Sequence, residues 1–226
     1  MRTFEAINKK KFPEPRPKLC KHCGSQFFPR TTFQSWCSSE CGYEIAKKKK
    51  AKKDKEQKSK DRKELKEMKI ETHSKEFKAD FQRDVNRLAR LIDSHFELTT
   101  CIDCDKPFGK QTDAAHFHSR SGNSSLRWNL HNLHSAASHC NQFSDKHKQG
   151  YEVGLSKRYG PEYSKYVIDE LPLIYKRIEV SNKQIYEKLA LVRSLIRNFN
   201  TFELQNPIHA RNLFNILIGI YTNNFK

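Results

Sequence analysis

The segment 18–43 carries two pairs of cysteines, Cys20 with Cys23 and Cys37 with Cys41, and this pattern leaves it few ways to fold. A CxxC turn directs two thiolates toward one point, and a second pair completes the tetrahedron of sulfur ligands that zinc prefers. Four protein ligands leave no open coordination position, so we expect this zinc ion to be structural. The pattern therefore predicts a ribbon-like zinc unit whose folding free energy comes mostly from the metal.

The chain contains 7 cysteines, an odd number, and carries a further CxxC pair at Cys101 and Cys104. No apolar run that resembles a signal peptide is found in its first residues. Cysteines of an unsecreted protein lie in a reducing compartment, where they bind metal more often than they form disulfides. We therefore expect metal ligands rather than disulfides, and a cytoplasmic protein.

The net charge is +17, from 43 Lys and Arg residues against 26 Asp and Glu residues. Such an excess favours a polyanionic partner, because basic side chains displace the counterions condensed on phosphates. Nucleic acid is the natural candidate, since no stretch approaches the roughly 20 apolar residues that a membrane-spanning helix needs. Only 36% of the residues are hydrophobic and 31% are charged, so we expect small units joined by solvated helix.

Composition separates the first part of the chain into an arm and a linker. Residues 1–17 are basic and contain three prolines, which predicts a flexible arm. Residues 44–76 form a predicted basic helical linker, whose stretch 47–69 holds 13 Lys and Arg and 5 Asp and Glu residues, a net charge of +8. This linker acts as a spacer, as a phosphate-binding segment or as both. The residues expected to contact DNA there are Lys47, Lys48, Lys49, Lys50, Lys52 and Lys53.

The remainder divides into a core with a leading helix, residues 77–150, and a C-terminal helical region, residues 151–226. Apolar residues recur at helical spacing at the start of the first part. In the second part, Ser181 and Gln184 form a capping box ahead of another apolar stripe. The apolar tail 212–221 is either core or a partner-binding face.

The segment between residues 98 and 150 is dense in Cys, His, Asn and Asp. In a strand, His116 and His118 project to the same face. On a helix, Asn141 and Asp145 share one face that suits oxygen coordination of a hard cation. An imidazole that takes a proton from water, facing a divalent ion that stabilises phosphate charge, has the parts for phosphodiester hydrolysis.

Ala115-His116, then Asn132, then Cys140-Asn141 resemble the motif of the HNH (ββα-metal) endonucleases. The resemblance implies that His116 is the general base and that Asn132 orients it by holding the backbone of the intervening loop. It further implies that Asn141 holds the catalytic ion, Mg²⁺ or Mn²⁺.

The same resemblance implies a second structural zinc site, in which Cys140 joins Cys101 and Cys104. Many family members carry a fourth zinc cysteine where this chain has Ala137. His139 is the nearest replacement for that ligand.

Many members also carry Asp as a metal ligand directly before the catalytic His, where this chain has Ala115. Asp113, His118 and Asp145 are the alternatives that the sequence leaves open for this ligand.

From Lys18 to Phe199 the chain resembles the NinG (Rap) family of lambdoid phage recombination proteins. This implies a structure-specific endonuclease that cuts D-loops and Holliday junctions. Arg120 and Arg127 lie near the site in the sequence and suit phosphate contacts through their paired donors. The matching segments are CKHCG, WCSSECG, the Lys-rich linker, CIDC, DAAH, NLHSAASHCNQ and KRYGPEY.

We therefore expect a mostly helical α+β fold with an N-terminal zinc ribbon-like unit, a long basic helix, a small ββα-metal core and C-terminal helices. The expected partners are branched DNA and other recombination proteins, and a homodimer is a further hypothesis because a symmetric junction has paired strands. Two alternatives stay open. One is an HNH endonuclease of the restriction or homing type, and the other is a non-catalytic zinc-containing DNA-binding recombination mediator.

Overall fold

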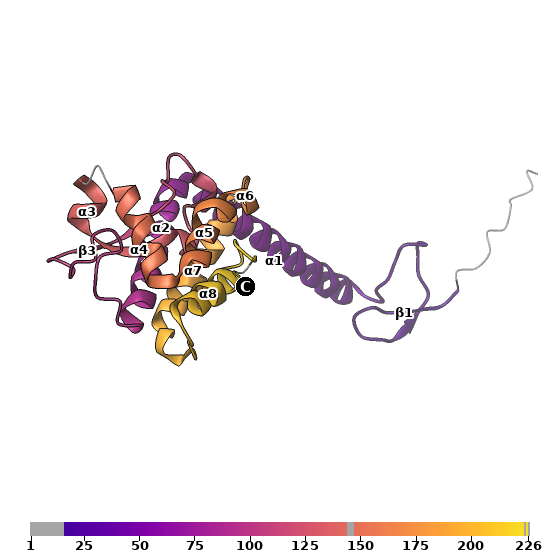
Figure 1. Ribbon diagram of the computed structural model, residues 1–226. Helices are drawn as coiled ribbons and strands as arrows, with labels where there is room; N and C mark the ends of the chain where they lie inside the picture. The colour runs from indigo at the N-terminus through magenta and orange to yellow at the C-terminus, as the bar shows by residue number, and fades with distance from the viewer. Residues whose placement is uncertain (1–15, 144–146, 224, 226) are drawn as a thin grey trace, which may run out of the picture. The chain divides into compact units, whose positions relative to one another are not determined.

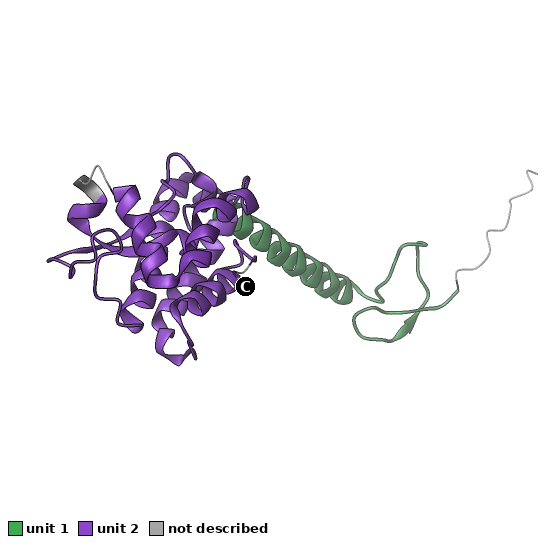
Figure 2. Ribbon diagram, viewed as in Figure 1, with its two compact units in different colours: residues 1–66 green, residues 67–226 purple. Residues whose placement is uncertain are grey.

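The computed structural model describes residues 16–143, 147–223 and 225, and it separates into two compact units, residues 1–66 and 67–226 (Figure 2). The arm expected at the N-terminus lies almost entirely outside the described residues. As predicted, the chain is mostly helical with small sheets, an α+β fold.

Unit 1 contains a two-stranded antiparallel sheet, β1 (Lys18–Leu19) and β2 (Gln26–Phe27), and most of helix α1 (Ser39–Thr72) (Figure 1). Lys, Glu, Ala and other strong helix formers fill α1, and no Pro interrupts it. Almost all its side chains are exposed, with Ile70 near its end the buried one. The long basic helix expected from the charge run is therefore present, and local propensity rather than burial accounts for it.

Unit 2 combines one small sheet with several helices. Its antiparallel strands, β3 (Thr112–His116) and β4 (Leu133–Ala137), pair from Thr112 opposite Ala137 to His116 opposite Leu133. The helices are α2 (Ser74–His95), α3 (Ser138–Phe143), α4 (His147–Tyr159), α5 (Pro161–Lys165), α6 (Leu171–Ile174), α7 (Asn182–Arg197) and α8 (Pro207–Ile218). Short turns of 3₁₀ or π type cover Ser124–Leu126, Leu130–Asn132, Tyr166–Glu170 and Phe199–Thr201. None of the described helices combines the length and the apolar character needed to cross a membrane.

A shared hydrophobic core holds unit 2 together. The stripe predicted for α2 is buried there through Phe81, Val85 and Ile92, and α2 packs against α7 and both strands. The predicted capping box starts α7, because the Ser181 side chain accepts from the backbone of Gln184 while the Gln184 side chain accepts from the backbone of Ser181. Local sequence signals thus placed both helices.

The apolar tail belongs to this core, since Phe214, Ile218 and Tyr221 are buried. Arg211 on α8 is fully buried as well, and its guanidinium donates to the carboxylate of Asp93 on α2. The core alternative for the tail therefore holds for these residues, while Ile216 and Leu217 on the same helix are exposed.

Candidate active site

Unit 1 gathers its four cysteines into one cluster. The Sγ atoms of Cys20, Cys23, Cys37 and Cys41 all lie within 4.8 Å of one another. The first pair lies at the turn between β1 and β2, where Gly24, at φ 76°, donates its N–H to the Cys20 carbonyl at 2.9 Å. Contacts with the thiols of Cys23 and Cys41 raise the pKa of Cys37 to about 12, so these crowded thiols resist joint ionisation unless a cation is present. As predicted, the cluster could hold a structural zinc ion.

Unit 2 has a second cluster, in which the Sγ atoms of Cys101, Cys104 and Cys140 lie within 4.8 Å of one another. The first two cysteines flank a turn ahead of β3, and Cys140 lies in α3. His139 does not belong to the cluster, because adjacent residues of a helix point about 100° apart. Within the described ranges, the cluster therefore offers three protein ligands that could hold zinc.

Each cluster is expected to bind its own zinc ion. Cys20→Ser should remove one ion per chain and Cys104→Ser the other, because the clusters belong to different compact units. Metal content measured by mass spectrometry on the purified full chain checks this. A variant that keeps the wild-type zinc content would refute the site it alters, and a folded wild-type chain without zinc would refute both.

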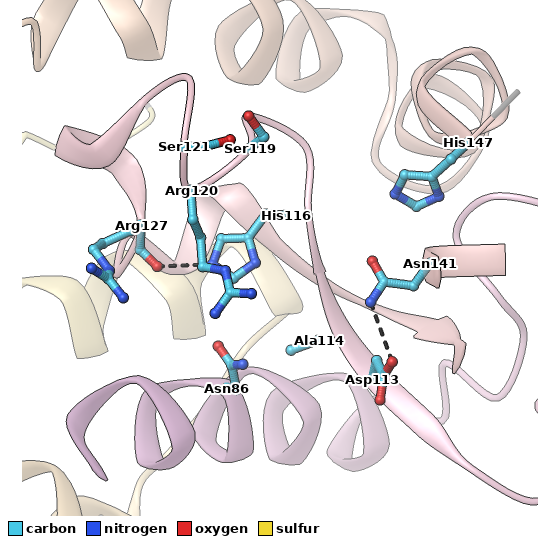
Figure 3. Close-up of a pocket in the computed structure, with 10 residues that line it drawn as sticks. All are labelled: Asn86, Asp113, Ala114, His116, Ser119, Arg120, Ser121, Arg127, Asn141 and His147. Atoms are coloured by element: carbon cyan, nitrogen blue, oxygen red, sulfur yellow. Dashed lines mark hydrogen bonds between the residues drawn. The ribbon is translucent and has the colours of Figure 1, made fainter. Parts of the chain in front are cut away.

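Strand β3, the loop after it and helix α3 line most of an open cavity of about 790 Å³ (Figure 3). Here β3, β4 and α3 follow one another as strand, strand and helix. The cavity therefore draws residues from the first strand and the helix of this ββα unit, from the loop between its strands, and from the neighbouring helices α2 and α4. Its lining consists of Asn86, Asp113, Ala114, His116, Ser119, Arg120, Ser121, Arg127, Asn141 and His147.

His116 is the last residue of β3 and is held in one orientation. Its Nε2–H donates to the carbonyl of Arg127 at 2.9 Å, so the neutral ring keeps Nδ1 unprotonated. In Figure 3, the ring nitrogen without a dashed bond lies on the side that faces Asn141 across the cavity. Burial, together with the charges of Arg120 and Arg127, lowers the pKa of His116 to about 4 despite that hydrogen bond. The ring is therefore neutral at pH 7 and can accept a proton.

Asn132 holds the loop that positions His116. Its buried side chain accepts from the backbone N–H of His118 at 2.7 Å, and it donates to the carbonyls of His118 at 3.0 Å and Leu126 at 3.1 Å. These bonds close the loop that contains Arg127, whose carbonyl binds the His116 ring. Asn132 thus makes the kind of backbone contacts that the resemblance implies.

Asn141 and Asp113 lie together across the cavity from His116 in Figure 3. The amide of Asn141 donates to the Asp113 carboxylate at 3.2 Å, which leaves its own amide oxygen and that carboxylate as hard donors. Ala115 is fully buried, so position 115 offers nothing to the cavity. Asp145, the other candidate on the chain after Asn141, lies outside the described residues.

The expectation that His118 shares a strand face with His116 is wrong, because β3 ends at His116. The ring of His118 instead donates from Nε2 to the carbonyl of Val167 at 2.8 Å, and it does not line the cavity. His118 is therefore not brought to the cavity that His116 lines.

His147, which the sequence does not single out, begins α4 and lines the cavity. Its Nδ1–H donates to the carboxylate of Asp103 at 3.0 Å. Asp103 lies between Cys101 and Cys104, the two cysteines of the second CxxC pair. This position in the motif is the local signal that could have drawn attention to Asp103. Nothing in the spacing of the two residues, 44 apart, indicates that they meet.

A second open cleft, of about 530 Å³, adjoins the cavity and is strongly basic. Both are lined by Asn86, Arg120 and Arg127, and the two arginines are those predicted to contact phosphate. The lysines predicted at the start of the linker lie on α1 in unit 1 and are exposed. The basic residues that α2 adds to the cleft were missed, because charges on a helix usually mark a solvated face. They are Lys75, Lys78, Arg83 and Arg90.

Together these features define a basic, cysteine-rich α+β protein, with two clusters that could hold zinc and a polar cavity on a ββα unit. The family model described as Bacteriophage Lambda NinG protein matches residues 12–198, and the chain belongs to this NinG family. Protein ninG of Escherichia phage lambda is 33% identical over 178 residues, covering 73% of this chain and 84% of that protein.

Two further relatives agree with this assignment. Protein ninG of Salmonella phage P22 is 33% identical over 174 residues, covering 71% of this chain and 82% of that protein. Protein ninG of Escherichia phage 933W is 31% identical over 176 residues, covering 73% and 84%. No solved structure matches the chain.

Proposed function

We propose that this protein is an HNH-type (ββα-metal) endonuclease that cuts branched DNA, such as D-loops and Holliday junctions, in phage homologous recombination. The observation that carries the proposal is the placement of His116 and Asn141 on opposite sides of one cavity (Figure 3). A neutral imidazole facing a pair of oxygen donors is suited to metal-dependent phosphodiester hydrolysis.

His116 acts as the general base in this proposal. Because its Nε2–H is bound to the Arg127 carbonyl, Nδ1 is the atom that takes a proton from the attacking water. The oxygen of that water then attacks phosphorus, and the sugar oxygen on the far side leaves. Asn132 acts as a positioning residue, since it fixes the loop that carries the carbonyl.

Asn141 and Asp113 would hold the catalytic ion, Mg²⁺ or Mn²⁺. Their donor set fits, because carboxylate and amide oxygens are suitable ligands for both ions. When bound, the ion supplies positive charge that stabilises the phosphate and the leaving oxygen during hydrolysis.

The basic cleft beside the cavity supports DNA as the substrate. Burial lowers the pKa of Arg90 and of Arg127. The protein groups around these two guanidinium groups therefore do not fully replace the water that burial removes. A phosphate backbone would provide that compensation, and the exposed lysines Lys47 to Lys53 of α1 would add further contacts. Contacts of this kind recognise backbone and shape rather than bases, which suits a branched substrate.

Ala115 favours one other function, a non-catalytic DNA-binding recombination mediator, because it replaces a ligand that many HNH enzymes use. An HNH enzyme of the restriction or homing type is the remaining alternative. In the proposed function the protein works in the cytoplasm of the phage host with other recombination proteins. A homodimer would match the paired strands of a junction.

A nuclease assay separates these functions. The zinc-loaded full chain is incubated with a D-loop, a four-way junction and a linear duplex of the same sequence, with and without Mg²⁺. The proposal expects Mg²⁺-dependent cutting of the branched substrates in preference to the duplex. Cutting of the linear duplex at a defined sequence would favour the restriction or homing alternative, and binding without cutting in either Mg²⁺ or Mn²⁺ would favour the mediator.

A further inference from the structure

We propose that His147 is a further ligand of the catalytic divalent cation, and that Asp103 is the residue that positions it. This inference rests on the proposed function, because it concerns the ion that Asn141 and Asp113 would hold. Many HNH enzymes have an Asp ligand directly before the catalytic His, where this chain has Ala115. The inference assigns a nitrogen ligand to the site that lacks this Asp.

His147 lies at the cavity where such an ion would bind. It lines the same cavity as Asp113, His116 and Asn141. In Figure 3 its ring lies on the side of the cavity occupied by Asn141 and Asp113, away from His116. The three side chains on that side therefore offer a carboxylate, an amide oxygen and an imidazole nitrogen.

The hydrogen bond to Asp103 sets which ring nitrogen is available. Because Nδ1 donates to the carboxylate at 3.0 Å, the lone pair of the neutral ring is on Nε2. A carboxylate that accepts from the other ring nitrogen is the usual companion of a metal-binding histidine, since it fixes the tautomer and makes the ligand more basic. The side chain of Asp103 is 7% exposed, so few water molecules compete for this bond.

Nε2 itself is buried and has no hydrogen-bond partner within the part of the chain that the structure describes. Buried polar atoms are normally paired, and an unpaired one destabilises the fold. A cation at the cavity would satisfy this nitrogen.

The second cysteine cluster holds Asp103 in place. Asp103 is part of the turn between Cys101 and Cys104, and α4 approaches this turn closely at Gly150. A Cβ atom at Gly150 would lie 1.8 Å from the carboxylate oxygen and 2.5 Å from the backbone oxygen of Asp103, so glycine is needed there. His147 is three residues earlier on the same helix face, which brings its ring to the carboxylate.

Binding of Mn²⁺ to the zinc-loaded full chain tests the inference, measured by electron paramagnetic resonance and by calorimetry without DNA. His147→Ala is expected to weaken Mn²⁺ binding by at least 10-fold. Asp103→Asn is expected to weaken it by about 10- to 100-fold, as is typical when the partner of a ligating histidine is changed. His95→Ala is the matched control, because His95 is exposed at the end of α2 and does not line the cavity.

Two conservative variants distinguish a ligand from a structural residue. His147→Asn keeps an amide N–H near the position of Nδ1, so the bond to Asp103 can form, but it has no donor at the position of Nε2. His147→Gln places its amide near Nε2 and offers an oxygen ligand there. We expect His147→Asn to bind Mn²⁺ as weakly as His147→Ala, and His147→Gln to retain part of the affinity. Zinc content and melting temperature measured for each variant show that it is folded.

Unchanged Mn²⁺ affinity in folded His147→Ala and His147→Asn would overturn the inference, even if the wild-type chain cuts DNA. A wild-type chain that binds no Mn²⁺ would overturn it too. If the wild type binds Mn²⁺ through His147 and yet cuts no DNA with either ion, the ligand assignment stands and the proposed nuclease function fails.

Discussion

His116→Ala is expected to abolish Mg²⁺-dependent nicking of branched DNA while leaving DNA affinity nearly unchanged. A positioned general base contributes about 10²- to 10⁴-fold to the rate. Among the described residues that line the cavity, His116 is the one whose ring nitrogen faces Asn141 from the opposite side. DNA binding should persist because it depends on the basic cleft, which the variant leaves intact. Single-turnover nicking at saturating protein, with binding measured in the absence of divalent ions, separates the two quantities.

His118→Gln is the matched control for this variant. It changes the histidine two positions later, whose ring is bound to the Val167 carbonyl outside the cavity, so nicking should be retained. The wild-type pH profile gives an independent check. Because the pKa of His116 is about 4, the base form is lost only as the pH falls through about 4, and no loss of nicking centred near 6.5 should come from this ring. Undiminished nicking by His116→Ala would refute its role as the base.

Arg211→Ala is expected to lower the free energy of unfolding of unit 2 by about 3–5 kcal/mol, the range found when one partner of a buried ion pair is removed. Arg211 and Asp93 are 0% and 1% exposed, so removing the guanidinium leaves a carboxylate in the core without its counter-charge. The guanidinium also donates to the carbonyl of Leu130 at 3.2 Å, next to β4. Urea unfolding of the zinc-loaded chain, followed by near-ultraviolet circular dichroism, measures the loss.

Arg193→Ala provides the comparison. Arg193 also pairs with carboxylates of α2, those of Asp80 and Asp84, but its side chain is 42% exposed. The side chains of Asp80 and Asp84 are 35% and 12% exposed, so this variant should lower stability by less than Arg211→Ala does, because solvent screens the half-exposed guanidinium. Equal effects of the two substitutions would show that burial of the Arg211 pair does not control its contribution. Combining Arg211→Leu with Asp93→Asn should recover part of the stability, because no uncompensated charge is then left.

Much of the fold and part of the site could be predicted because the signals are local. The α2 stripe and the capping box of α7 are set by residues three or four positions apart, and these spacings act through the geometry of a single helix. The cysteine pairs are equally local, since each CxxC turn brings its own two thiols together. The order of His116, Asn132 and Asn141 came from the resemblance to the HNH motif, and the structure places these residues at the end of β3, in a 3₁₀ turn and in α3.

The charge run shows where prediction from composition stops. The sequence predicted a helix over the lysine-rich segment, and α1 is present there. It did not predict the basic cleft of unit 2, because the arginines of the loop after β3 meet the lysines of α2 only when the loop folds onto that helix. Those residues are far apart in the sequence, and each by itself looks like an ordinary solvated charge.

The amino-acid sequence by itself therefore determined helices α1, α2 and α7, the cysteine pairs and the basic character of this protein, because each depends on short spacings or on composition. The family, and the joining of Cys140 to Cys101 and Cys104, followed from the resemblance. Only the tertiary structure decided that Asp93 pairs with Arg211, that His118 turns away to Val167, and that Asp103 meets His147. These contacts join residues between 44 and 118 positions apart, and burial in the core strengthens the pair of Asp93 with Arg211 in particular. No local pattern encodes such a meeting, since it depends on how several separately specified elements pack at once.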